Sequence, residues 1–189
     1  MAIAAKRREP DASGHSNPQI AFADVTLELG GKTIIENLSL GVRPGEFLCI
    51  VGASGCGKTT ALRLAAGLYQ PTSGKVNFDG QPMLHPRREI AIVFQDYGKA
   101  LLPWRTAAGN VSLALVAASG ATVIFVTHDL DEAIYLGDRV IGLLPHPGRI
   151  GIELPVNLPR PRDQLSTREQ PEFLRLRRQL FDFIKATEQ

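Results

Sequence analysis

Apolar and polar residues alternate along two stretches near the start of the chain, as they do in strands with one buried face. The stretch IAFADVTLEL begins at Ile20, TIIENLSLGV ends at Val42, and Gly30-Gly31 between them is typical of a turn. EFLCIVG, which ends at Gly52, is instead almost continuously apolar, as in a strand that is buried on both faces. The pattern predicts a β-hairpin at a half-exposed sheet edge, followed by a buried strand.

Helix and strand patterns alternate along the rest of the chain. TTALRLAAGL has apolar residues at helical spacing and ends at Gly67, and DLDEAIYLG opens with acidic residues that suit the positive end of a helix dipole. Further strands are predicted for GKVNFDG, REIAIVFQ, ATVIFVT and DRVIGLL, and a further helix for TAAGNVSLALVAA. Strands that alternate with helices predict an α/β fold: a mainly parallel sheet with flanking helices and an antiparallel β edge.

The two ends of the chain differ from this main domain, which we place at residues 19–157. Residues 1–18 are mostly polar and contain two prolines, so we expect a disordered leader. Residues 158–189 begin as a polar linker, PRPRDQ, and continue as an amphipathic helix, for which packing against the domain is favoured over a membrane-surface or dimer helix. The apolar residues of that helix recur every three or four positions: Phe173, Leu176, Leu180, Phe181 and Ile184.

Composition excludes several classes of protein. The formal net charge is +2, and no stretch combines dense Lys and Arg with aromatic residues, so we expect no nucleic-acid partner. No window approaches the ~18 apolar residues of a membrane span, and no signal-peptide pattern is present, which predicts a cytoplasmic chain. Cys49 and Cys56 have no partner at metal or redox spacing, and we expect neither to be bridged.

The motif that carries chemistry is GASGCGKT, which fits the P-loop pattern G-x-x-x-x-G-K-[ST] between a buried strand and a helix. Its glycines let backbone N–H groups curve around phosphate oxygens, at the positive end of the following helix. Lys58 can place a positive charge between two phosphates, and the Thr59 hydroxyl can bind Mg²⁺. The predicted nucleotide-binding residues in this loop are Gly52, Ala53, Ser54, Gly55, Cys56, Gly57, Lys58, Thr59 and Thr60.

The sequence around this loop resembles a known family. GASGCGKTTALRLAAGL, with VRPGEF before it and PTSGKVNFDG after it, is similar to the ATP-binding subunit of ABC transporters. VFQDYGKALLPWRTAAGNVSLAL and VTHDLDEAIYLGDRVIGLL narrow the resemblance to importers of nitrate, sulfonate, taurine and related solutes, over residues 20–155. The resemblance implies ATP and Mg²⁺ as cofactors, ATP-driven import of a small anion, and a place on the inner face of the cell membrane. It does not choose among the three solutes, because importer selectivity resides in the binding protein and the permease.

The resemblance also implies roles for particular residues. Gln95 is at the Q-loop position, where its amide oxygen can bind Mg²⁺ together with Thr59, and His128 is at the position of the switch histidine that contacts the γ-phosphate. The segment from Asp96 to Arg105 would face a transmembrane permease subunit, although the apolar residues around Trp104 could instead cover the core. A second ATPase subunit is a further implied partner.

Three other histidines have no such context. We assign no role to His15, His85 or His146.

The chain departs from the family pattern between its Q-loop and its switch histidine. The helical subdomain, the LSGG-type signature, the strand ending in Asp-Glu and the Ala-Leu-Asp loop are missing from the sequence, which predicts a deletion of several dozen residues near Val116 to Ser119 and the loss of an internal strand. Asp96 and Asp129 are candidate replacements for the lost carboxylates, but neither directly follows its apolar run. Loss of a general base commonly lowers a rate by ~10²–10⁴-fold.

Three interpretations follow. The chain is an importer ATPase; or it is a non-hydrolysing nucleotide-binding remnant; or it is an unrelated P-loop kinase, which the Q-loop and switch-histidine motifs disfavour. The position expected to hold an adenine-stacking aromatic residue is Leu29, for which Phe22 is a candidate replacement.

Overall fold

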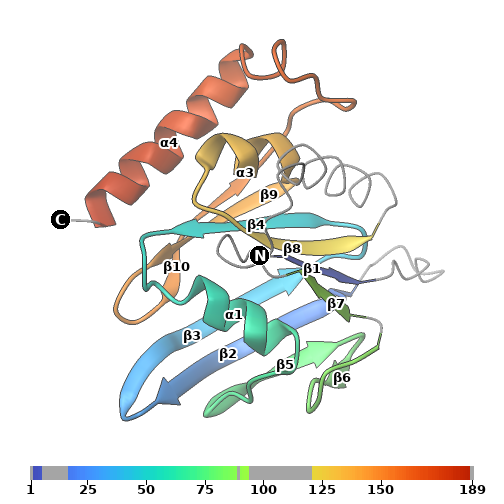
Figure 1. Ribbon diagram of the computed structural model, residues 1–189, viewed down its shortest axis with the longest axis vertical. Helices are drawn as coiled ribbons and strands as arrows, with labels where there is room; N and C mark the ends of the chain where they lie inside the picture. The colour runs from blue at the N-terminus through green and yellow to red at the C-terminus, as the bar shows by residue number, and fades with distance from the viewer. Residues whose placement is uncertain (1, 6–16, 89, 94–120, 188–189) are drawn as a thin grey trace, which may run out of the picture.

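Two β-sheets and the helices between and beside them make up the computed structural model of this protein (Figure 1). The structure describes residues 2–5, 17–88, 90–93 and 121–187. One sheet has the order β3 (Lys32–Val42), β2 (Ile20–Leu29), β5 (Ser73–Phe78) and β6 (Gln81–Pro82). The other has the order β10 (Arg149–Pro155), β9 (Arg139–Leu144), β4 (Phe47–Gly52), β8 (Thr122–Val126), β1 (Ala2–Ala5) and β7 (Ile90–Val93).

The predicted hairpin is present as β2 and β3. Gly30 and Gly31 form its turn with φ angles of 57° and 73°, a conformation that glycine adopts without steric cost. β2 pairs antiparallel with β3 on one side and β5 on the other. Its alternating pattern leaves Val25 and Leu27 buried and Glu28 exposed, so one face of this sheet contributes to the core.

The centre of the larger sheet is parallel, as predicted. β4 pairs in parallel with β8 and with β9, and Ile50 lies opposite both Val126 and Ile141. Every residue of β4 is buried, which explains its continuous apolar run. Alternate residues serve two cores: Ile50 packs with α1 (Lys58–Ala65) and the smaller sheet, whereas Val51 packs with the helices on the opposite face.

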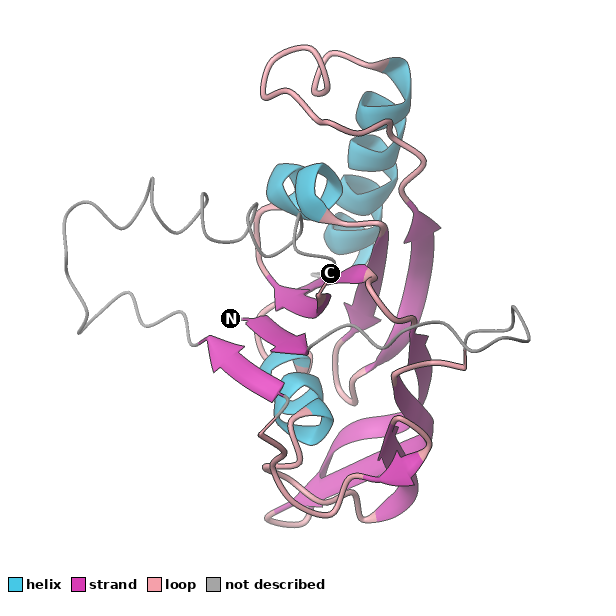
Figure 2. Cartoon of the chain, turned by 90° about the vertical axis from the view of Figure 1, so that its right-hand side faces the viewer, coloured by secondary structure: helices cyan, strands magenta, loops and turns pink. Residues whose placement is uncertain are grey.

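Those helices are α3 (Leu130–Leu136) and α4 (Pro171–Thr187), which lie beside each other (Figure 2). The predicted amphipathic helix at the end of the chain is therefore present, and it packs against the domain. Phe173, Leu176 and Leu180 are buried, but Phe181 is 54% exposed and does not belong to the buried face as we expected. Ile184, the last member of the predicted stripe, is partly buried.

Two strands of the larger sheet were not predicted, and they make that sheet mixed. β10 runs antiparallel to β9 at one edge. β1 runs antiparallel to both β8 and β7, although residues 1–18 were expected to be a disordered leader. The expectation is wrong for Ala2–Ala5, because AIAA is an apolar run that can pair with two strands at once. The helix predicted from TAAGNVSLALVAA lies outside the described residues.

Candidate functional site

The P-loop joins the end of β4 to the start of α1, as the sequence predicts. Gly57 is the N-cap of α1 with φ of 93°, and no side chain caps this helix end. A Cβ atom at Gly57 would lie 2.6 Å from Cδ1 of Ile35, and one at Gly52 would lie 2.7 Å from Sγ of Cys56. Only glycine fits at either position, so the loop presents backbone at the mouth of the helix, where N–H groups favour an anion.

Lys58 is held inside this loop. Its side chain is buried, and its ammonium donates hydrogen bonds to the carbonyl oxygens of Gly52 and Ala53, both at 2.7 Å, and to Sγ of Cys56 at 3.7 Å. These contacts employ all three donors of the ammonium group. None of the acceptors carries a formal charge, so phosphate oxygens would form stronger, charge-assisted bonds with the same ammonium.

The other P-loop residues divide between core and surface. Cys56 is buried and unpaired, as is Cys49 in β4, which confirms the expectation that neither is bridged. Ser54 and Gly55 are exposed, and Thr59 is exposed in the first turn of α1. The Thr59 hydroxyl is thus accessible to Mg²⁺, a cation that prefers oxygen ligands. Within the described ranges, no group of three His, Cys, Asp or Glu side chains could hold a metal ion.

His128 lies at the same edge of the sheet as the P-loop. The parallel register places Ile50 opposite Val126. Gly52, the last residue of β4, and His128, two residues past the end of β8, therefore lie at the same edge of the sheet. Although the His128 side chain is largely exposed, its partial burial and the positive charge of Lys58 lower the pKa of the imidazole below its ordinary value. The imidazole is therefore neutral at pH 7, and one ring nitrogen can donate to a phosphate oxygen.

Asp129 is engaged in local structure. It is the N-cap of α3, where its carboxylate accepts a hydrogen bond from the Glu132 amide at 3.0 Å. Glu132 in turn accepts from the Thr127 hydroxyl at 2.6 Å. A carboxylate that caps a helix is oriented toward that helix, which supports the sequence-based argument against Asp129 as a replacement catalytic carboxylate.

Sequence reasoning missed the turn between β9 and β10, which packs against the P-loop. Gly148 donates to the Ile34 carbonyl at 2.8 Å and accepts from the Glu36 amide at 3.0 Å. A Cβ atom at Gly148 would lie 2.4 Å from the Cys56 carbonyl oxygen, and one at Gly55 would lie 3.9 Å from Cε1 of His146. The alternating stretch RIGIELP after the turn sequence PHPG carried the signal for this hairpin.

The proposed replacement for the adenine-stacking aromatic residue is wrong. Phe22 is 5% exposed and belongs to the core between the smaller sheet and α1, so its ring cannot stack on a base. Leu29 is 42% exposed at the end of β2.

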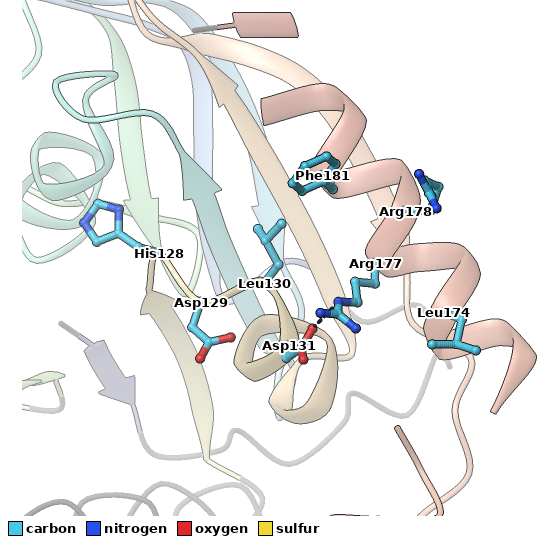
Figure 3. A pocket seen from close by; sticks show the side chains of 8 residues that line it. All are labelled: His128, Asp129, Leu130, Asp131, Leu174, Arg177, Arg178 and Phe181. Atoms are coloured by element: carbon cyan, nitrogen blue, oxygen red, sulfur yellow. Dashed lines mark ion pairs between the residues drawn. The ribbon is translucent and has the colours of Figure 1, made fainter. Parts of the chain in front are cut away.

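A shallow groove extends from His128 toward α4 (Figure 3). Asp131 of α3 pairs with Arg177 of α4 at 3.0 Å, and the exposed side chains of Leu174 and Phe181 belong to the same groove. No P-loop residue lines it. The loop geometry, rather than this groove, therefore defines the candidate nucleotide site.

Two predicted features follow β7 in sequence. β7 ends at Val93, which pairs with Ala2 at the same edge of the sheet as the P-loop. Gln95 and the segment of residues 96–105 come next, and both lie outside the described residues.

A parallel strand that ends in a P-loop, with a helix after the loop and a histidine just past the end of the neighbouring strand, defines a P-loop nucleotide-binding protein. Comparison with known families agrees. The ABC transporter profile matches residues 35–169, and the chain belongs to the ABC transporter family, as an ATP-binding domain.

Proteins of similar sequence align with most of the chain. An ATP-binding protein of Brucella melitensis is 32% identical over 223 residues, which covers 88% of this chain and 93% of that protein. A nitrate import ATP-binding protein of Synechococcus elongatus is 30% identical and covers 82% and 86%. An aliphatic sulfonates import ATP-binding protein of Burkholderia cenocepacia is 31% identical and covers 90% and 92%.

Solved structures support the fold. The ATP-binding subunit of an ABC transporter matches with a TM-score of 0.56 at 14% identity, covering 84% of this chain and 99% of that one. A dimeric ABC transporter cassette matches with a TM-score of 0.53 at 20% identity, covering 73% and 99%. The predicted P-loop α/β fold is therefore confirmed.

Proposed function

We propose that this chain is the ATP-binding subunit of an importer for a small anion of the nitrate, sulfonate or taurine type. The observation that carries the proposal is the P-loop: Lys58 is buried among loop carbonyls 2.7 Å away, at a helix start where only glycine fits. Relatives that are named for nitrate and for aliphatic sulfonate import support the anion class.

ATP·Mg²⁺ would bind along the P-loop and reach His128. Backbone amides from Gly52 to Thr60 and the Lys58 ammonium would surround the β- and γ-phosphates. Thr59 and Gln95 would bind Mg²⁺, and the neutral His128 imidazole would donate to a γ-phosphate oxygen. Bound Mg²⁺ would neutralise phosphate charge during transfer to water.

The chain would work beside a membrane-embedded partner. No helix in the described part of the chain is long and apolar enough to cross a membrane. We propose that residues 96–105 contact the permease on the inner face of the cell membrane and that a second ATPase subunit completes the assembly. Trp104 is the only tryptophan in the sequence, so its fluorescence should change when the permease is added and should not change with an unrelated membrane protein.

A second candidate function is a nucleotide-binding remnant that does not hydrolyse ATP. The 223-residue alignment with the Brucella melitensis protein is longer than this 189-residue chain. This difference in length supports the internal deletion that we propose, whose position near residues 116–119 comes from the sequence motifs alone. Asp129 caps α3 instead of facing the P-loop, so among the described residues it supplies no substitute base.

Two measurements on the purified chain test these functions. Titration with Mg·ATP should show saturable binding. Lys58→Ala should abolish this binding, and Lys32→Ala, at an exposed lysine that begins β3, should leave it unchanged. Equal affinity in the Lys58→Ala variant would refute the assigned site. Phosphate release then distinguishes the two functions: turnover that disappears in Lys58→Ala supports the ATPase, and binding without turnover supports the remnant.

Reading the gene around codons 116–120 tests the deletion directly. An in-frame segment that is present in the gene but absent from this sequence would restore the signature and the catalytic carboxylates. An uninterrupted coding sequence would make the shortened domain a property of the protein.

A further inference from the structure

The first described strand, β1, lies inside the larger sheet rather than at its edge. Each of its four residues has a Cα partner on both sides: Ala2 lies opposite Phe125 and Val93, and Ala5 lies opposite Thr122 and Ile90. A strand so short makes few backbone contacts of its own. Pairing on two sides doubles the number of hydrogen bonds that hold it.

The direction of β1 is opposite to that of its neighbours. β7 and β8 are each antiparallel to β1, so they run parallel to each other, and β8 is parallel to β4. Adjacent strands are ~4.8 Å apart, so β7 and β8 are separated by about twice that spacing and cannot pair directly. β7, β8 and β4 therefore share one direction, and a space one strand wide separates β7 from β8.

The strand beside that space is buried and needs backbone partners. Val123, Ile124 and Phe125 of β8 are at most 1% exposed, so the ladder groups of this strand lie deep in the molecule. An unpaired N–H or C=O group at such depth costs ~1–3 kcal/mol, and a charged residue would cost more. The occupant must therefore be an extended, uncharged strand.

We propose that β7 and β8 form a peptide-binding slot for one short apolar strand in antiparallel orientation, and that the chain fills it in cis with its own Ala2–Ala5. The sequence AIAA meets the requirement, since it contains only apolar residues and no charge. β7 has β1 as its sheet neighbour within the described ranges. The inserted strand thus holds β7 in the sheet, where it would replace the internal strand whose loss the sequence predicts. This inference goes beyond the proposed function and does not depend on nucleotide binding.

A disulfide tests the pairing in the full chain. Ala4 and Val123 are directly opposite, and facing residues of antiparallel strands lie within the Cα separation that a disulfide spans. The double variant Ala4→Cys, Val123→Cys should form an intramolecular bond between these two positions on mild oxidation, detected by peptide mapping. The control Ala12→Cys, Val123→Cys keeps the same acceptor and moves the first cysteine out of β1. No bond in the first variant, equal bonding in the control, or a bond only between two chains would overturn the proposal.

Hydrogen exchange gives an independent readout. Ile3→Pro removes a backbone N–H from the middle of β1, whereas Ala12→Pro makes the same change outside it. Amides of Ile90–Val93 and Thr122–Val126 should exchange at least ~10-fold faster in Ile3→Pro than in Ala12→Pro, while β2 and β3 keep their protection. Equal exchange in the two variants would contradict the proposal. If Ile3→Pro does not fold, the disulfide result in the otherwise unchanged chain decides.

Discussion

The ammonium of Lys58 donates a hydrogen bond to the carbonyl oxygen of Gly52 at 2.7 Å, across the loop that joins β4 to α1. The loop therefore closes around its own lysine, which is 6% exposed. A buried ammonium must keep its acceptors or exchange them for better ones. Phosphate oxygens are better acceptors because they are charged, which makes this contact the one that a nucleotide would replace.

The pKa of His128 should respond to the charge at Lys58. Partial burial and the Lys58 charge lower this pKa below its ordinary value near 6.5, so the imidazole resists protonation as the pH falls. The unfolded chain binds a proton near pH 6.5 and the folded chain does so only at lower pH, so His128 makes folding less favourable as the pH falls below 6.5.

NMR titration of the His128 ring measures this effect. Lys58→Met should raise its pKa toward 6.5, and Lys32→Met should not change it. Saturating Mg·ATP should also raise the pKa, because the triphosphate brings negative charge. A pKa that is the same with and without the Lys58 charge would contradict the arrangement.

Gly57 should tolerate an added side chain less well than Gly55 does. Gly57→Ala combines a φ of 93° with a 2.6 Å approach to Cδ1 of Ile35, so it should lower the free energy of unfolding by ~2–4 kcal/mol. Gly55→Ala is the matched control, because its φ of 78° is similar but the nearest atom is 3.9 Å away, and it should cost ~1–2 kcal/mol. Urea denaturation compares the two. Equal losses would mean that backbone strain, and not packing against β3, dominates.

Glu46 should contribute more to stability than Glu153, although both pair with Arg139 at 2.7 Å. The Glu46 side chain is 7% exposed and also accepts from the Arg43 amide at 2.7 Å, whereas Glu153 is 47% exposed. Glu46→Gln should cost ~2–4 kcal/mol, because it leaves a largely buried guanidinium with a weaker partner, and Glu153→Gln should cost less than ~1 kcal/mol. Thermal unfolding of both variants at one pH measures the contrast. A larger loss for Glu153→Gln would refute it.

The ring of Phe183 should be one reason why only glycine fits at position 142. A Cβ atom at Gly142 would lie 2.5 Å from Cε1 of Phe183 and 2.5 Å from Cγ2 of Ile152. Gly142→Ala should therefore destabilise the protein by ~1–3 kcal/mol and loosen α4 from β9.

A double-mutant cycle with Phe183→Ala isolates this contact. Part of the Gly142→Ala loss should disappear in the Phe183→Ala background, because the ring no longer blocks the new methyl group, while the clash with Ile152 remains. Strict additivity of the two losses would show that Phe183 does not limit the size of residue 142.

The sequence by itself determined the P-loop and most of the elements around it. The pattern from Gly52 to Thr59 requires a strand before it and a helix after it, and the local periodicities supplied both. It also predicted the helix at the end of the chain, because a stripe of apolar residues at helical spacing needs only local information. Those features depend on residues that are neighbours in the chain.

The tertiary structure decided what depends on distant residues. Nothing in AIAA distinguishes a strand from a helix, since alanine favours helices, and only pairing with Ile90–Val93 and Thr122–Val126 makes it a strand. Likewise Phe22 and Phe181 have the same side chain, but Phe22 is buried in a sheet that packs on α1, whereas Phe181 lines an open groove beside α4. Whether a side chain is buried depends on which surfaces pack together in the folded protein. The order of residues along the chain does not specify that packing.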